Sequence, residues 1–129
     1  MSKYGNKKVT FNGIKFDSKK EAERYKFLLM MKNAGEITDL ELQKRFEIIP
    51  SQYEEVETGE VYKRGDKKGQ PKTKKKCFEQ SVVYVADFAY KKNGQLVVED
   101  TKGMLTPDYI IKRKLMLYIL GIKISEIRG

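Results

Sequence analysis

Histidine is absent from the sequence, and cysteine occurs once, as Cys77. A zinc site built from cysteine and histidine therefore cannot be assembled. A Ser-His-Asp triad is excluded, and no histidine can act as a general base. Any catalysis must use carboxylates, lysines, tyrosines or a metal held by oxygen ligands. The single cysteine also permits no internal disulfide, which is typical of proteins in a reducing cytoplasm.

Long hydrophobic runs are missing as well. The first residues lack the apolar stretch of a signal peptide, and no segment is long enough to span a bilayer. We therefore expect a cytoplasmic protein without membrane contact.

Positive charge is what the sequence has in excess. The 129 residues suit one compact domain, and 40% of them are hydrophobic, which is enough for a core. Lys and Arg number 27 against 18 Asp and Glu, so the formal net charge is +9. A basic surface gains affinity for a polyanion by displacing counterions from phosphates. The composition predicts nucleic acid as a partner.

The first half of the chain predicts a hairpin, a helix and a strand. Asn12-Gly13 tolerates the positive φ angles of a type I′ turn between two short strands. Ser18 and Glu21 form the S-x-x-E pattern of a capping box, so we predict a helix over about residues 18–34. Alternating apolar residues at 40–48 predict a strand with an irregularity near Lys44 and Arg45.

The middle of the chain combines a predicted hairpin with a basic segment. We expect residues 53–62 to form a hairpin around Thr58-Gly59. Residues 63–76 hold eight basic residues and one acid, 8 − 1 = +7, among glycines and a proline, which predicts a mobile loop that supplies most of the net charge. We interpret the loop as an arm that contacts DNA phosphates through the lysines of its second half: Lys72, Lys74, Lys75 and Lys76.

The second half predicts a strand pair, a helix and a last strand. A long strand from Phe78 through Tyr90 should turn back at Asn93-Gly94. Thr106-Pro107-Asp108 opens a helix that runs to about residue 120, and 122–127 is a short strand. The simplest architecture is one α/β domain over residues 1–129 with a mixed sheet.

Two acids are expected to lie side by side on the predicted strand pair. A two-residue turn at Asn93-Gly94 pairs residues whose numbers sum to 187, and Asp87 and Asp100 satisfy that sum. Strand alternation places Asp100 and Lys102 on one face and Glu99 on the other. Two opposed carboxylates repel unless a cation compensates, and Mg²⁺ prefers oxygen ligands of this kind. Lys102 could then orient the attacking water or stabilise the phosphorane, although D-x-K pairs are often plain surface ion pairs.

These residues carry a family resemblance. Asp87 followed by Asp100-x-Lys102 on the next strand, after a helix bearing Glu21, resembles the PD-(D/E)XK nuclease superfamily. The chain is similar to a group of small phage and prophage proteins of that superfamily in five ordered segments: K-Y-G-N-K-K (3–8), F-x-S-K-K-E-A (16–22), Y-V-A-D-F (84–88), V-E-D-T-K-G (98–103) and Y-I-I-K-R-K (109–114).

The resemblance implies a restriction-endonuclease-like α-β-β-β-α-β core, DNA as substrate, and Mg²⁺ as cofactor with Mn²⁺ as the alternative ion. It assigns metal binding to Asp87, Asp100 and Glu21, and the catalytic lysine to Lys102. The superfamily's proline before the first Asp is Ala86 here. Glu21 has a second interpretation of equal weight, as the third helical residue of the capping box.

Other polar residues are weaker candidates. Lys112, Arg113 and Lys114 on the second helix could grip phosphates beside the cut or form its solvated face. Gln43 could approach the site or be an exposed strand residue.

The leading hypothesis is a metal-dependent DNA endonuclease in a bacterial or phage-infected cell. By analogy with phage nucleases of this size, its substrates include branched DNA such as Holliday junctions, whose cutting needs a homodimer. The alternatives are a non-catalytic nucleic-acid-binding module and a nuclease-fold regulatory protein.

Overall fold

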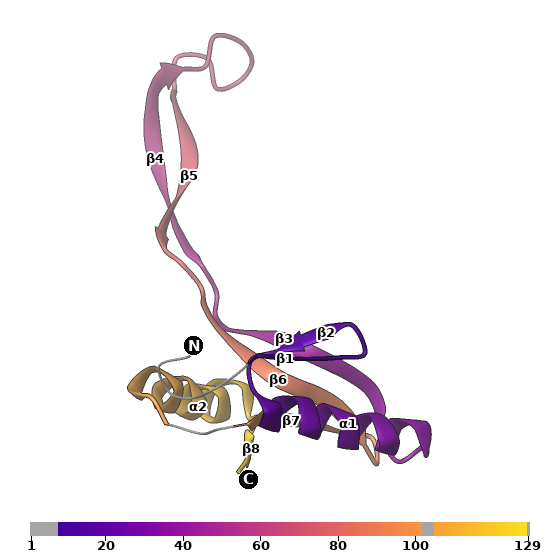
Figure 1. Cartoon of the computed structure of the whole chain (residues 1–129). Coiled ribbons are helices and arrows are strands. Elements are labelled where there is room, and N and C mark those ends of the chain that lie inside the picture. The colour runs from indigo at the N-terminus through magenta and orange to yellow at the C-terminus, as the bar shows by residue number, and fades with distance from the viewer. Residues whose placement is uncertain (1–7, 102–104, 129) are drawn as a thin grey trace. The chain divides into compact units, whose positions relative to one another are not determined.

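A computed structural model describes residues 8–101 and 105–128 of the chain (Figure 1). The chain divides into two compact units, residues 1–46 with 84–129 and residues 47–83, which are described separately below. The elements, in chain order, are β1 (Val9–Phe11), β2 (Ile14–Phe16), α1 (Lys19–Asn33), β3 (Thr38–Ile49), β4 (Gln52–Val61), β5 (Pro71–Glu79), β6 (Val82–Lys92), β7 (Gln95–Thr101), α2 (Pro107–Leu120) and β8 (Ser125–Ile127).

The larger unit is built on a mixed sheet with two helices. Its strand order is β3-β6-β7-β8; β6 and β7 are antiparallel, whereas β7 and β8 are parallel. The β1–β2 hairpin turns at Asn12 and Gly13, which have φ angles of 54° and 78°. Asn93 and Gly94, with φ angles of 53° and 76°, make the same kind of turn between β6 and β7. The predicted α/β class and both Asn-Gly turns are confirmed.

Helix α1 begins and ends where its sequence predicts. The backbone N–H of Glu21 donates to Ser18 Oγ at 3.1 Å, and Gly35 follows the helix with a φ of 80°. Leu28 on its inner face is completely buried, which contributes roughly 1.5–3 kcal/mol. The helix shares one core with the β1–β2 hairpin and the sheet: Phe16, Ala22, Tyr25, Leu28, Ile37, Phe88 and Tyr90.

Strand β3 contains the irregularity that its sequence predicts. Gln43 has a φ of 51°, which an extended strand residue does not adopt, immediately before Lys44 and Arg45. Helix α2 also agrees with expectation: Thr106 Oγ1 accepts the N–H of Tyr109 at 3.2 Å, and Gly121 ends the helix in the left-handed conformation.

The smaller unit differs from its prediction. β4 is one strand through Thr58 and Gly59 rather than a hairpin, because Gly59 takes a φ of 86° in an irregular stretch between Glu57 and Val61. Its partner β5 begins at Pro71, so the expected loop over 63–76 is a turn only as far as Gln70. Backbone hydrogen bonds close that turn, including Gly69 N–H to Tyr62 O at 2.8 Å. We call the β4–β5 pair with this turn the ribbon.

The charge of the ribbon also differs from expectation. Glutamates of β4 lie opposite lysines of β5, as in the pairs Glu54–Lys76 and Glu55–Lys75. Residues 47–83 contain eight basic and seven acidic residues, 8 − 7 = +1. The remaining 92 residues contain 27 − 8 = 19 basic and 18 − 7 = 11 acidic residues, which gives +8. The +7 of residues 63–76 is thus offset within the smaller unit by the glutamates that flank this segment, and the larger unit carries the remaining +8.

None of the helices in the described part of the chain is long and apolar enough to cross a membrane. Cys77 is exposed on β5 and forms no disulfide.

Candidate active site

Three acids from three elements meet in the larger unit: Glu21 of α1, Asp87 of β6 and Asp100 of β7. In each β6–β7 pair from Lys92↔Gln95 to Phe88↔Glu99, the two residue numbers sum to 187. The predicted register is therefore confirmed up to the residues next to Asp87 and Asp100. The carboxyl group of Asp87 lies within hydrogen-bonding contact of both Asp100 and Glu21. We call these three residues the acid cluster.

Asp87 is fixed by the end of β7. Its Oδ2 accepts the backbone N–H and the Oγ1 hydroxyl of Thr101, each at 2.8 Å. Burial alone would raise the pKa of Asp87, but hydrogen bonds from Glu21 and Thr101 outweigh it and hold the pKa below its ordinary value. Asp87 is thus the member of the cluster that stays ionised.

Glu21 carries the proton of the pair. The residue is 5% exposed, and its Oε2 accepts the backbone N–H of Asp17 at 3.0 Å. Burial, followed by the hydrogen bond and the charge of Asp87, raises the pKa of Glu21 to about 8. The backbone N–H of Glu21 thus donates to the capping Ser18, as the helix-start interpretation predicts, and metal binding by its carboxyl group stays a prediction.

Asp100 is buried and receives a tyrosine hydroxyl. It is 3% exposed, and Tyr84 OH donates to its Oδ2. Burial, and then the hydrogen bond to this carboxylate, raises the pKa of Tyr84, which remains a donor at any physiological pH. The Tyr84 hydroxyl thus holds one oxygen of the Asp100 carboxyl group.

Two limits apply to the metal prediction. Lys102 lies outside the described residues. Over residues 8–101 and 105–128, no group of three or more His, Cys, Asp or Glu residues has the arrangement of a metal site.

Glu99, the neighbour of Asp100 in the chain, has different surroundings. It is 1% exposed and accepts two hydrogen bonds from Arg24, Nε to Oε1 at 2.7 Å and a terminal nitrogen to Oε2 at 2.6 Å. Tyr90 OH donates to the same Oε2. Glu99 pairs with Phe88, a member of the core beneath α1. This agrees with the expected separation of Glu99 from Asp100 by strand alternation.

The cations of α2 do not act as one group. Arg113 donates to Glu126 Oε2 at 3.0 Å, and its guanidinium lies 5.9 Å from the centre of the Tyr109 ring. Tyr109 OH donates to the same carboxylate at 2.7 Å. These bonds, first the one from Tyr109, lower the pKa of Glu126. Arg113 is therefore engaged in a polar network that joins α2 to β8.

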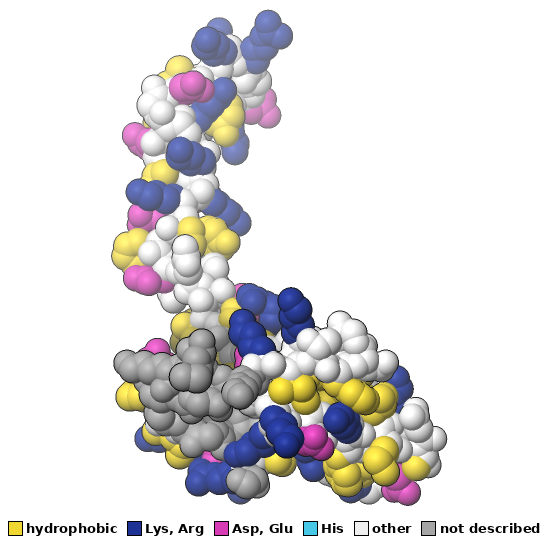
Figure 2. Space-filling view, in the orientation of Figure 1, with side chains coloured by type: hydrophobic (Ala, Val, Ile, Leu, Met, Phe, Trp, Pro, Cys, Tyr) yellow, Lys and Arg dark blue, Asp and Glu magenta, His cyan; other side chains and the backbone are white. Residues whose placement is uncertain are grey.

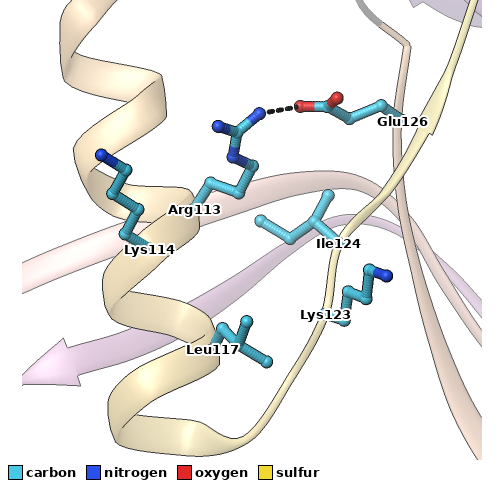
Figure 3. A pocket seen from close by; sticks show the side chains of 6 residues that line it. All are labelled: Arg113, Lys114, Leu117, Lys123, Ile124 and Glu126. Atoms are coloured by element: carbon cyan, nitrogen blue, oxygen red, sulfur yellow. Dashed lines mark hydrogen bonds and ion pairs between the residues drawn. The ribbon is translucent and has the colours of Figure 1, made fainter.

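A pocket of about 250 Å³ lies beside that network, between α2 and β8 (Figure 3). Leu117 and Ile124 point into it, whereas the amino groups of Lys114 and Lys123 point away from each other. Lys112 does not line it. The pocket is thus bounded by two apolar side chains, two lysines that diverge, and the Arg113–Glu126 ion pair.

No contact of the other sequence candidates with the three acids is described. Gln43 is exposed, and none of the contacts given above for the three acids involves it. Lys74, Lys75 and Lys76 are exposed on β5 of the ribbon, and Lys72 lies 3.9 Å from Glu60.

Two site residues were not expected from the sequence: Thr101, which anchors Asp87, and Tyr84, which holds Asp100. Thr101 is one residue beyond the register partner of Asp87, where alternation predicts the opposite face, so the sum rule does not indicate this contact. No sequence signal marks Tyr84 either.

Comparison with known families gives one match. The family described as "Protein of unknown function (DUF1064)" matches residues 1–127, so the chain belongs to this family. No curated protein and no solved structure matches the chain.

Proposed function

We propose that this member of the DUF1064 family is a metal-dependent DNA endonuclease with a restriction-endonuclease-like core. The observation that carries the proposal is the contact of three carboxyl groups, from Glu21, Asp87 and Asp100, at one end of the β6–β7 pair. Acids held this close cost stability unless a proton or a cation lies between them. A strongly raised carboxyl pKa with a specific charge partner is a feature of functional sites.

The donor set suits a hard divalent cation. Mg²⁺ and Mn²⁺ prefer carboxylate oxygens and take only one or two carboxylates from the protein, with water and substrate phosphate completing the shell. Asp87 and Asp100 would hold the ion, and Glu21 would join them after giving up its proton. When bound, such an ion neutralises charge on the phosphate and lowers the pKa of a water molecule.

The remaining roles belong to the chain itself. Thr101 fixes the Asp87 carboxylate through two hydrogen bonds, and Tyr84 fixes Asp100 through one, so both acids are oriented before substrate arrives. Lys102 follows Asp100 by two residues and is proposed to donate to the phosphate or to orient water.

Two further features support DNA as the substrate. The larger unit carries a net charge of 19 − 11 = +8, which favours contact with phosphates. Its element order α1-β3-β6-β7-α2-β8, with the ribbon between β3 and β6, fits the α-β-β-β-α-β order of the superfamily that the sequence resembles. Branched DNA and a homodimer follow only from analogy with phage nucleases.

A second candidate has its own support. Burial, and then Asp87, raise the pKa of Glu21 to about 8, and the described residues form no three-ligand metal group. A non-catalytic DNA-binding module, in which the acid cluster is structural, would show these features too.

The deciding experiment incubates the protein with supercoiled plasmid, linear duplex and synthetic four-way junctions, with Mg²⁺, with Mn²⁺ and with EDTA. We expect metal-dependent cleavage that falls by about 10³-fold in Asp100→Asn and in Lys102→Ala, because losing the metal-assisted step removes several kcal/mol of transition-state stabilisation. Glu36→Gln, an exposed acid on the α1–β3 turn, is the matched control and should cleave normally.

Cleavage that persists in both site variants would overturn the site. Binding to DNA without metal-dependent cleavage by the wild-type protein would favour the binding module.

A further inference from the structure

The ribbon has no core of its own. β4 and β5 pair only with each other, and the large apolar residues Tyr53, Val61 and Phe78 are 59%, 47% and 67% exposed. Figure 2 shows basic, acidic and exposed hydrophobic side chains interspersed along it. An isolated two-stranded hairpin is marginally stable in water. Its charged side chains therefore need an explanation other than packing.

The two faces of the ribbon differ in charge. The register runs without interruption from Tyr53↔Cys77 to Glu57↔Thr73, so alternation assigns each side chain to a face. One face holds Lys72, Lys74 and Lys76 of β5 with Glu54 and Val56 of β4, a balance of 3 − 1 = +2; we call it the lysine face. The other, the glutamate face, holds Glu55, Glu57 and Lys75 with Tyr53, Thr73 and Cys77, a balance of 1 − 2 = −1.

The turn extends the lysine face. The Tyr62 ring lies 5.6 Å from Lys72 Nζ and 5.8 Å from Lys67 Nζ, so the aromatic ring is next to the last lysine of that face. Residues 63–68 add four basic residues and one acid, 4 − 1 = +3. Glu60, 3.9 Å from Lys72, offsets one of these charges. The lysine face and the turn together remain cationic.

We propose that the lysine face and the Tyr62 turn bind the phosphate backbone of duplex DNA, and that the glutamate face is directed away from it. The proposal rests on DNA as the partner named under the proposed function, and it does not depend on cleavage. Lysines two residues apart on a strand are separated by about 7 Å, so Lys72, Lys74 and Lys76 form a row of point charges. A two-stranded ribbon is also narrow enough to enter the major groove.

Charge favours DNA over pairing between identical edges of two ribbons. Both edges of the ribbon are unpaired among the described strands, and open edges can pair with another strand. Each edge, however, carries a run of like charges, glutamates on β4 and lysines on β5, and such charges oppose edge pairing of like strands. A polyanion meets no such opposition on the lysine face.

The test compares neighbouring lysines on opposite faces. Binding of a fluorescent 20-base-pair duplex to the full chain is measured by anisotropy in EDTA at several salt concentrations. The wild-type protein is compared with the variants Lys74→Gln and Lys75→Gln. We expect Lys74→Gln to weaken binding by roughly 3- to 10-fold and to reduce the slope of log K against log salt by about one. Lys75→Gln should change affinity by less than about twofold, because its removal affects only a distant charge.

The outcomes separate this proposal from the proposed function. Equal weakening by the two variants, or a larger effect of Lys75→Gln, would overturn the assignment of faces while leaving the nuclease proposal intact. Absence of duplex binding by the wild-type protein would also overturn the lysine-face proposal. If the protein bound only single-stranded RNA, RNA would replace DNA as the partner of this face. Loss of cleavage with the expected difference in binding would contradict only the nuclease proposal. A change in sedimentation mass caused by Lys74→Gln would indicate a second copy of the chain on this face.

Discussion

Two buried glutamates in the larger unit differ in how their charge is compensated. Glu99 is 1% exposed and receives both nitrogens of the Arg24 fork and a hydroxyl from Tyr90. Glu21 is 5% exposed and faces another carboxyl group, that of Asp87. Arg24 follows Glu21 by three residues on α1, so the residues of α1 that take part in these two acid contacts lie about one helix turn apart.

The difference separates a structural acid from a functional candidate. A carboxylate with a bidentate arginine is compensated within the protein and ties α1 to β7 without further ligands. A carboxyl group against a carboxylate is compensated only by a proton, which a cation can replace. The Arg24–Glu99 pair is therefore assigned to the frame of the fold, and the acid cluster is the candidate for the proposed ion.

The largest effect that tests this division is on stability. Arg24→Ala leaves Glu99 buried without its cation, and we expect the free energy of unfolding to fall by about 3 kcal/mol. Glu21→Gln at pH 6 should change it by less than about 1 kcal/mol, because glutamine keeps the neutral hydrogen bond of a protonated acid. Urea denaturation followed by circular dichroism measures both values.

Arg24→Lys is the control for this pair, since it retains the charge but loses the planar fork. It should recover part of the loss. A larger loss in Glu21→Gln than in Arg24→Ala would reverse the roles assigned to the two sites.

A smaller effect is expected from pH. The pKa of Glu21 is raised from 4.5 to about 8, so the folded protein binds a proton in this window that the unfolded chain releases. That contribution to stability is complete below pH 4.5 and is lost as pH rises to about 8. Asp87 acts in the opposite direction, because its lowered pKa gives stability that is lost only as pH falls below its ordinary value.

We therefore expect the wild-type protein to lose on the order of 2 kcal/mol between pH 5 and 8 relative to Glu21→Gln, less than the full shift because the two acids titrate as a pair. Urea midpoints at intervals of half a pH unit measure the difference. Parallel pH profiles of the two proteins would show that Glu21 does not carry the shared proton.

Much of the larger unit could be predicted from local sequence. Ser18 with Glu21 and Asn93 with Gly94 specify a helix start and a tight turn through the conformations that these residues favour. A two-residue turn fixes every pair beyond it, which is why the register of β6 and β7 could be counted out to the neighbours of Asp87. The proximity of Asp87 and Asp100 was thus expected from a turn and an alternation rule, whereas Glu21 was assigned to the site only by the family resemblance.

The ribbon could not be predicted in the same way. Residues 63–76 are rich in lysine and glycine and lack apolar residues, so they indicate a loop when read alone. The strand forms because the glutamates of β4 lie opposite these lysines, an interaction between segments about 20 residues apart. Tyr84 was missed for a related reason: its hydroxyl finds Asp100 only through tertiary packing.

The smallest expected effect distinguishes the two tyrosines. Tyr84 OH donates to Asp100, Tyr90 OH donates to Glu99, and both residues are buried, at 4% and 6% exposed. Removing either hydroxyl deletes one hydrogen bond to a carboxylate, so Tyr84→Phe and Tyr90→Phe should each lose about 1–2 kcal/mol of stability.

Only Tyr84→Phe should also lower metal-dependent cleavage, by roughly 10-fold, because it releases an acid that orients the proposed ion. Cleavage rates are measured without urea, at a temperature at which both variants are folded. Equal rates for the two variants would show that the tyrosine–Asp100 bond contributes to the fold alone, in the same way as the bond to Glu99.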